Sequence, residues 1–126
     1  MPSLARATYA VFGTLAVGLG VIALVHPASA LPSEAVSPLT AHLIQEQGAE
    51  GIFIGLMSLW CLLGVSSRRP VHMALLIFTA LFAGIHWFEY LQARRTLASP
   101  LLNSIPFLAF LTTAPFSRVS KPARSS

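Results

Sequence analysis

Histidine and glutamate side chains fall at helical spacing in two separate stretches of this sequence. The first stretch has a histidine and two glutamates spaced i, i+4 and i+8, and the second has a histidine, a glutamate and a tyrosine spaced i, i+3 and i+4. These residues are His42, Glu46 and Glu50, followed by His86, Glu89 and Tyr90. Carboxylates and imidazoles that share a helix face can form ion pairs, carry protons or bind metal ions.

The two stretches are expected to meet at one depth of a helical hairpin whose turn is centred near Arg68. Both helices of such a hairpin rise about 1.5 Å per residue, so residues equally far from the turn lie at similar levels. Glu50 and His86 are each 18 positions from Arg68, and Glu46 and Tyr90 are each 22 positions from it. The next predicted hairpin brings an asparagine to the same level. We call this set the outer polar cluster, which comprises Glu46, Glu50, His86, Glu89, Tyr90 and Asn103.

Several roles are open for the outer polar cluster. An ionisable side chain in the membrane interior costs about 2.5–3.5 kcal/mol on the insertion scale, so it normally has a partner or a function. Glu50 and His86 are natural partners, either as an interhelical clasp or as a ligand or proton site. A single metal ion on His86, Glu50 and Glu89, or a haem with His86 as one axial ligand, is the alternative. These residues alone assign no cofactor.

The composition places the cluster in an integral membrane protein. Hydrophobic residues make up 55% of the 126 residues and charged residues 10%, and the mean hydropathy is +0.72. Soluble domains carry about a quarter charged residues. The composition therefore excludes a soluble enzyme, a DNA-binding module and a disordered tail. The pI near 10.3 reflects basic residues beside apolar runs, so no nucleic-acid partner is expected and the lipid bilayer is the expected environment.

Four apolar segments predict an all-α, polytopic membrane protein, built as an antiparallel bundle of four transmembrane helices in a single domain, residues 1–117. The helices are expected at about 6–26, 40–66, 71–93 and 100–117, with a basic mobile tail at 118–126. The first segment also has features of a cleavable signal peptide, with Arg6 before it and Ala28-Ser29-Ala30 after it. Its length favours a retained helix.

Basic residues predict the orientation of the chain, because cytoplasmic loops carry an excess of lysine and arginine. Six basic residues fall on the side that holds both termini: Arg6, Arg68, Arg69, Arg118, Lys121 and Arg124. Only Arg94 and Arg95 fall on the opposite side. We therefore expect a multi-pass protein of the bacterial inner (plasma) membrane with both termini in the cytoplasm.

Small residues on the second segment indicate a close helix contact. Gly51 and Gly55 form a small-xxx-small pattern, which allows close approach within the bundle, to a membrane protein partner or to a second copy of the chain. Cys61 lies in an apolar run with no paired thiol, and we interpret it as a small core residue.

Two sequence patterns carry a resemblance to a known group. The first segment has glycine repeats and ends at a proline, GTLAVGLGVIALVHP, and the second places polar residues before a glycine-rich apolar run, QEQGAEGIFIGLMSLWCLLG. With compact third and fourth segments and a basic boundary, the chain resembles the DoxX-like small four-helix integral membrane proteins over about 110 residues. The resemblance implies membrane accessory or redox-associated roles.

Three functions are therefore considered. The leading expectation is a non-catalytic accessory or lipid/quinone-contacting subunit that uses the outer polar cluster as its contact site. The alternative is a small proton-coupled transporter, because four short helices and a membrane carboxylate resemble small multidrug resistance transporters. The third is an oxidoreductase subunit with a metal or haem at His86. A binding role is expected over an enzymatic one.

Overall fold

The computed structural model describes residues 3–30, 35–64 and 68–113, and these residues form four α-helices and one short 3-10 helix without a strand. The bounds are α1 Ser3–Val25, η1 Pro27–Ala30, α2 Pro38–Cys61, α3 Arg69–Leu91 and α4 Ala98–Thr113. The predicted all-α class is confirmed. The predicted tail at 118–126 lies outside the described residues.

Prolines and one capping box set the helix boundaries. α1 ends just before His26-Pro27, where the ring of proline removes a backbone donor. At the start of α2, the Ser37 hydroxyl accepts from the Thr40 amide at 3.1 Å, and the Ser37 amide donates to Thr40 Oγ1 at 2.8 Å. Pro70 occupies the first turn of α3, a position that needs no amide hydrogen.

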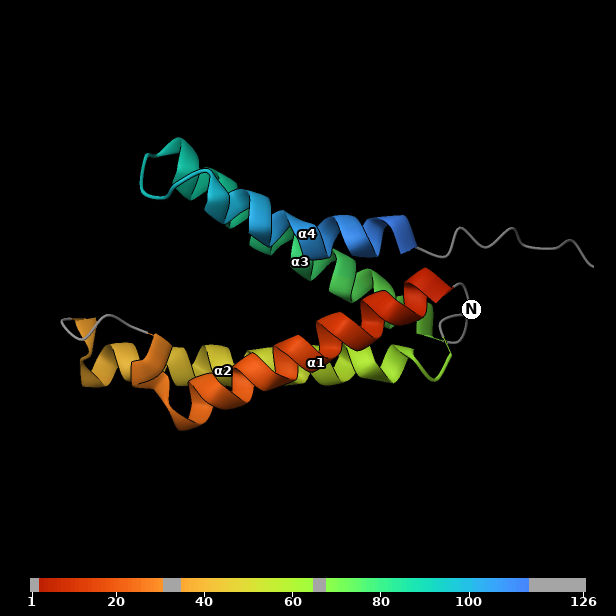
Figure 1. The fold of residues 1–126 in the computed structure, drawn as a ribbon, viewed down its shortest axis with the longest axis horizontal. Helices are drawn as coiled ribbons and strands as arrows, with labels where there is room; N and C mark the ends of the chain where they lie inside the picture. The colour runs from red at the N-terminus through yellow and green to blue at the C-terminus, as the bar shows by residue number, and fades with distance from the viewer. Residues whose placement is uncertain (1–2, 31–34, 65–67, 114–126) are drawn as a thin grey trace, which may run out of the picture.

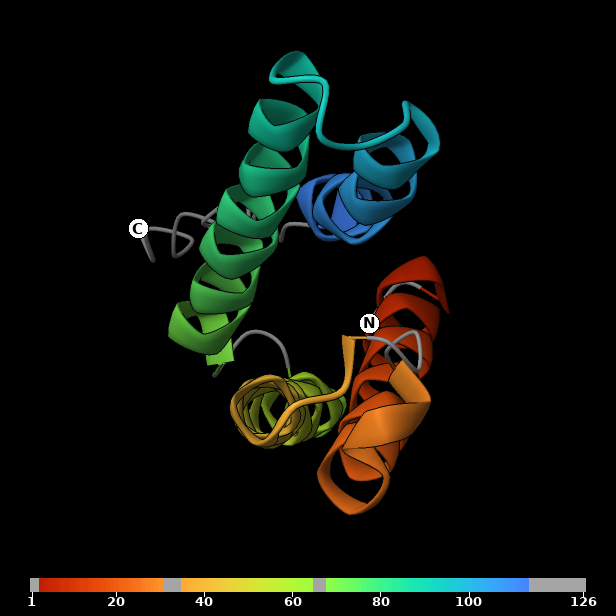
Figure 2. The ribbon, with the colours of Figure 1, turned by 90° about the vertical axis from the view of Figure 1, so that its left-hand side faces the viewer.

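The four helices form two hairpins that meet at one end and diverge at the other (Figure 1). α1 packs mainly on α2, and α3 packs mainly on α4, whereas α2 and α3 make far fewer contacts. Figure 2 looks onto the end where the hairpins diverge and shows α1 beside α2, and α3 beside α4. We call the shared end, where α1 and α3 begin and α2 and α4 end, the junction.

Glycines allow α1 and α2 to touch through their backbones. Gly13 and Gly20 of α1 are seven residues apart, and so are their partners Gly55 and Gly48 of α2. A Cβ atom added to Gly20 would lie 2.6 Å from the Gly48 carbonyl oxygen, and one added to Gly55 would lie 2.8 Å from the Gly13 oxygen. Gly55 therefore packs within the chain, whereas a Cβ at Gly51 would meet only ordinary contacts.

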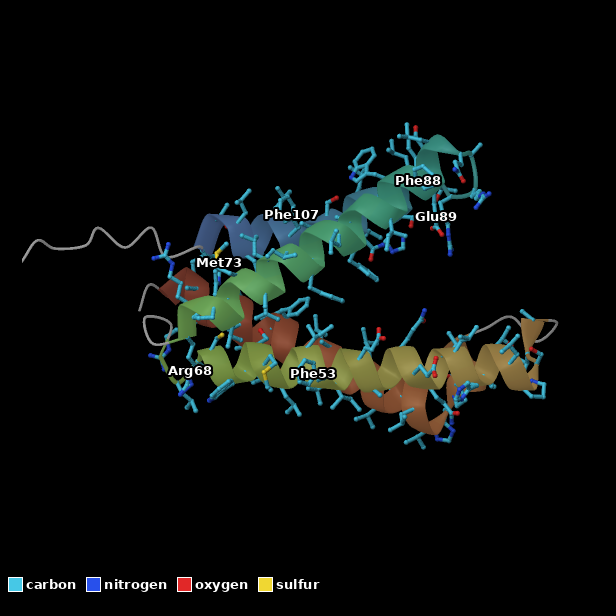
Figure 3. All side chains as sticks on the ribbon, turned by 180° about the vertical axis from the view of Figure 1, so that it is seen from behind. Phe53, Arg68, Met73, Phe88, Glu89 and Phe107 are labelled. Atoms are coloured by element: carbon cyan, nitrogen blue, oxygen red, sulfur yellow. The ribbon has the colours of Figure 1, made fainter. Side chains whose placement is uncertain are left out.

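Few apolar side chains of the described residues are buried, and most of these lie at the junction. The core cluster consists of Ala5, Tyr9, Cys61, Leu75 and Phe110. Away from the junction, large apolar residues face outward along every helix; Leu19 is 65% exposed and Leu91 is 78% exposed (Figure 3 shows the side chains along the ribbon). Such extensive apolar exposure is unusual for a soluble monomer.

Two of the described helices are long and apolar enough to cross a membrane. They are Leu4–Val25, with a mean hydropathy of 2.1, and Arg69–Leu91, with a mean hydropathy of 1.8. α4 is also apolar but has only 16 residues. The described helices thus provide two candidate spans by length and composition, rather than the four that the sequence predicts.

Candidate functional site

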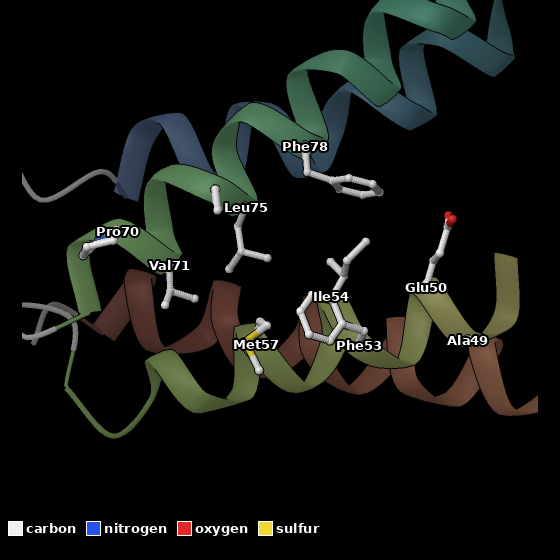
Figure 4. Close-up of a pocket in the computed structure, with 10 residues that line it drawn as sticks. Ala49, Glu50, Phe53, Ile54, Met57, Pro70, Val71, Leu75 and Phe78 are labelled. Carbon is white, nitrogen blue, oxygen red and sulfur yellow. The ribbon is translucent and has the colours of Figure 1, made fainter. Parts of the chain in front are cut away.

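An apolar cleft separates α2 from α3 between the two hairpins (Figure 4). Its volume is about 800 Å³. The lining residues are Ala49, Glu50, Phe53, Ile54 and Met57 from α2, and Pro70, Val71, Ala74, Leu75 and Phe78 from α3. The divergence of the hairpins creates this space, because α2 packs mainly on α1 and α3 packs mainly on α4.

Of the described residues that line the cleft, Glu50 is the one with a charged side chain. Figure 4 shows its carboxylate directed from α2 toward the space beside Phe78. Within the described ranges, Glu50 forms no hydrogen bond and no ion pair. A carboxylate on an otherwise apolar wall leaves its acceptor capacity open for a ligand, because an ionised carboxylate accepts up to four hydrogen bonds.

The structure does not bring Glu50 and His86 together. Glu50 faces the cleft from α2, whereas His86 lies on the diverging part of α3, where its Nδ1 is hydrogen-bonded to the Ser99 hydroxyl at 3.1 Å. The equal distance from Arg68 fixes only the level of a residue along each helix. The hairpins separate laterally above the junction, so residues at one level lie on different arms (Figure 1).

The rest of the predicted outer polar cluster divides between the two arms. On α2, Glu46 pairs with His42 at 3.2 Å, and both side chains are exposed. At the far end of α3, Glu89 lies 3.8 Å from His86 Nδ1 and accepts a hydrogen bond from Arg95 Nε at 3.2 Å. These are local contacts within one hairpin rather than links between the two.

Tyr90 and Asn103 also make local contacts in the second hairpin. The ring of Tyr90 meets the Trp87 ring edge-on at 6.0 Å, and the Asn103 amide donates to the Ser99 carbonyl oxygen at 2.8 Å. Trp87 Nε1 donates to Ser104 Oγ at 3.0 Å and so ties α3 to α4.

The contacts of His86 do not match those of a catalytic triad. In a triad, the nucleophile and the carboxylate bond opposite nitrogens of the imidazole ring. Here the Ser99 hydroxyl and the Glu89 carboxylate both face Nδ1. The group can stabilise the end of the α3–α4 hairpin, but it cannot relay a proton from Ser99 to Glu89 through the ring.

The metal alternative is also not assembled. In the part of the chain that the structure describes, no three histidine, cysteine, aspartate or glutamate side chains gather closely enough to hold a metal ion. His86 and Glu89 are neighbours on α3, but Glu50, the third ligand of the predicted set, lies on the other arm.

The junction contains a buried polar pair that was not among the sequence-based predictions. The Tyr9 hydroxyl of α1 is hydrogen-bonded to His72 Nδ1 of α3, and neither residue is exposed to solvent. Phe110 of α4 packs on both rings, at centroid distances of 5.7 Å and 6.0 Å. Ser58 of α2 donates to the Tyr9 carbonyl oxygen at 3.1 Å. All four helices therefore meet around this pair.

This pair was predictable from the positions of its two residues along their helices. Tyr9 and His72 are isolated polar residues in apolar runs, and each lies close to the start of its helix, where the junction forms. Arg68, just before α3, is fixed nearby, since its guanidinium lies 4.5 Å from the Trp60 ring centroid and donates to the Trp60 carbonyl oxygen at 3.2 Å.

Comparisons with protein-family models, with curated proteins and with solved structures found no match for this chain.

Proposed function

We propose that this chain is a multi-pass membrane protein that binds one lipophilic molecule, such as a lipid or a quinone, in the cleft between its hairpins. The single observation that carries the proposal is the apolar cleft of about 800 Å³ in a chain whose surface is already apolar. Binding sites for small molecules commonly have volumes of about 300–1,000 Å³ and mainly apolar linings.

Membrane insertion is supported by the arrangement of the helices. α1 and α3 are apolar enough to cross a bilayer, and α2 and α4 run antiparallel beside them (Figure 1). A helix packed along a spanning helix shares its depth, so α2 and α4 are proposed to cross as well. The excess of basic residues at the junction side supports cytoplasmic termini in a bacterial inner membrane. A relationship to the DoxX-like membrane proteins is part of this proposal and rests on the sequence patterns of the first two segments.

The lining of the cleft favours an apolar chain as its occupant. Phe53, Ile54 and Leu75 present hydrocarbon surface to the cleft. Lipid tails are as apolar as this wall, so within a membrane an alkyl chain binds here through van der Waals packing rather than through removal from water. An acyl chain or an isoprenoid tail matches this surface. The role proposed is binding without catalysis.

A thermal-shift experiment on the full chain in detergent tests this proposal. A long-chain alcohol or a short-tailed quinone should raise the melting temperature, because a ligand at 100 times its Kd stabilises the folded state by about 2.7 kcal/mol. Ala74→Trp places an indole in the cleft and should abolish the shift. The matched variant Met73→Trp, at an exposed position next to Ala74 that does not line the cleft, should retain it. Equal shifts for both variants would contradict the proposal.

A second candidate is a small proton-coupled transporter, favoured by the unpartnered Glu50 in the cleft. Two hairpins joined only at the junction could rock about it and expose Glu50 to either side. In that case, Glu50→Gln would abolish substrate-driven proton flux in proteoliposomes, whereas a purely binding protein would show no such flux.

A further inference from the structure

We propose that Glu50 makes the cleft selective for single-chain amphiphiles with a positively charged amine head group. This inference rests on the proposed function, because it names the ligand class of the same cleft. It follows from where the carboxylate lies, from what surrounds it, and from which charges elsewhere in the fold are already paired.

The position of Glu50 along α2 separates it from both ends of the helix. α2 runs from Pro38 to Cys61, so Glu50 lies close to its midpoint and about 17 Å from either end at 1.5 Å per residue. In a spanning helix, this position is in the hydrocarbon region, far from the head groups. An ionised carboxylate at such a depth normally faces a cavity or a partner. Glu50 faces the cleft.

The other two glutamates of the described residues have basic neighbours, and so differ from Glu50. Arg68 lies on the Trp60 ring near the junction, and Arg95 donates to Glu89 at the far end of the second hairpin. One turn before Glu50, Glu46 pairs with His42. Among the described residues, Glu50 is the one glutamate that forms no ion pair with a basic side chain of those same ranges. A cationic ligand in the cleft would supply the complementary charge.

The cleft has an apolar wall with a single carboxylate at one end, which matches an amphiphile that has an alkyl chain and an amine head group. From Met57 to Glu50 the wall extends about 11 Å along α2, with Phe53 and Ile54 between them. An alkyl chain on this wall would place its ammonium group at Glu50, and ammonium–carboxylate hydrogen bonds are among the strongest in proteins.

The same charge disfavours other amphiphiles. A fatty acid would place a second carboxylate beside Glu50, and a phospholipid would bring a phosphate into the cleft. A neutral alcohol can donate one hydrogen bond but forms no ion pair. The expected order of binding is amine first, alcohol second and carboxylate last.

Photolabelling of the full chain in phosphatidylcholine nanodiscs tests this order. Three probes share one diazirine-bearing alkyl chain and end in a primary amine, an alcohol or a carboxylate. Mass spectrometry then counts the adducts on residues 49–57 and 70–78. We expect the amine probe to label these residues about tenfold more than the alcohol probe, because the ammonium–carboxylate hydrogen bond is charged on both sides and the alcohol–carboxylate bond on only one. Tenfold corresponds to about 1.4 kcal/mol.

Two variants make the test specific. Glu50→Gln keeps the shape and a hydrogen-bonding group, and it should reduce amine labelling to the alcohol level while alcohol labelling is unchanged. Glu46→Gln, one turn away and paired with His42, should leave amine labelling unchanged. Alcohol labelling of each variant also reports whether the cleft is still formed.

The outcomes separate the ligand class from the binding site itself. Equal labelling of the cleft by all three probes in the unchanged chain would overturn the amine selectivity and leave the proposed function standing. Absence of cleft labelling by every probe would overturn both. If a Phe53→Cys variant then formed a disulfide between two chains, the cleft would be assigned to a second copy of the protein instead.

Discussion

Alanine substitution at two glycines of the same helix should change stability in opposite directions. A Cβ added at Gly20 would lie 2.6 Å from the Gly48 carbonyl oxygen and 2.9 Å from the Ile52 amide nitrogen, whereas a Cβ added at Gly18 meets nothing within 4 Å. The obstacle at Gly20 is the backbone of α2, which cannot rotate away as a flexible side chain would. α1 and α2 would have to move apart.

The magnitude follows from two effects. In both variants, alanine in place of glycine favours the helix by about 0.5–1 kcal/mol. At Gly20 the extra methyl group also overfills a close contact, which typically costs about 1–3 kcal/mol. The helix preference cancels between the two variants, so Gly18→Ala should be more stable than Gly20→Ala by about 1–3 kcal/mol.

The assay is reversible unfolding of the purified chain in mixed micelles, with the free energy of unfolding measured for both variants side by side. Gly84→Ala on α3, where a Cβ also meets nothing within 4 Å, provides a second control in the other hairpin. If Gly20→Ala were as stable as Gly18→Ala, the backbone contact between α1 and α2 would be refuted.

Three further outcomes are expected. Tyr9→Phe leaves His72 Nδ1 buried without its hydrogen bond and should lower the free energy of unfolding by about 1–3 kcal/mol. An unchanged free energy of unfolding would show that the pair does not stabilise the junction. The double-mutant cycle of Glu50→Ala and His86→Ala should be additive within about 0.5 kcal/mol, because they lie on different arms; larger coupling would mean that the hairpins close. A reporter enzyme fused after Ser126 should be active only in the cytoplasm, and external activity would reverse the proposed orientation.

The helices were predictable from the sequence because their causes are local. Apolar runs interrupted by His26-Pro27 and by Arg69-Pro70 determine where chain direction can change, and Ser37-Pro38 starts α2 with a capping box. The glycine pattern on α2 also predicted a close contact. Its location was less accurate, because Gly48 and Gly55 carry the backbone contact rather than Gly51 and Gly55.

The composition of the site was not predictable from the same patterns. Spacing from a turn gives the level of Glu50 and His86 along their helices. Their lateral separation depends on which neighbours α2 and α3 pack against. The glycines draw α2 onto α1, and the Trp87–Ser104 hydrogen bond ties α3 to α4. Those long-range contacts open the cleft between the hairpins and leave Glu50 alone in it.

Native mass spectrometry of the intact chain released from membranes detects whether the cleft between α2 and α3 holds one lipophilic molecule. We expect a species with the mass of the chain plus one bound lipid, quinone or amine, present in the unchanged protein and lost in Ala74→Trp, which fills the cleft. A bare chain under the same conditions, or a bound molecule that Ala74→Trp does not displace, would contradict this expectation.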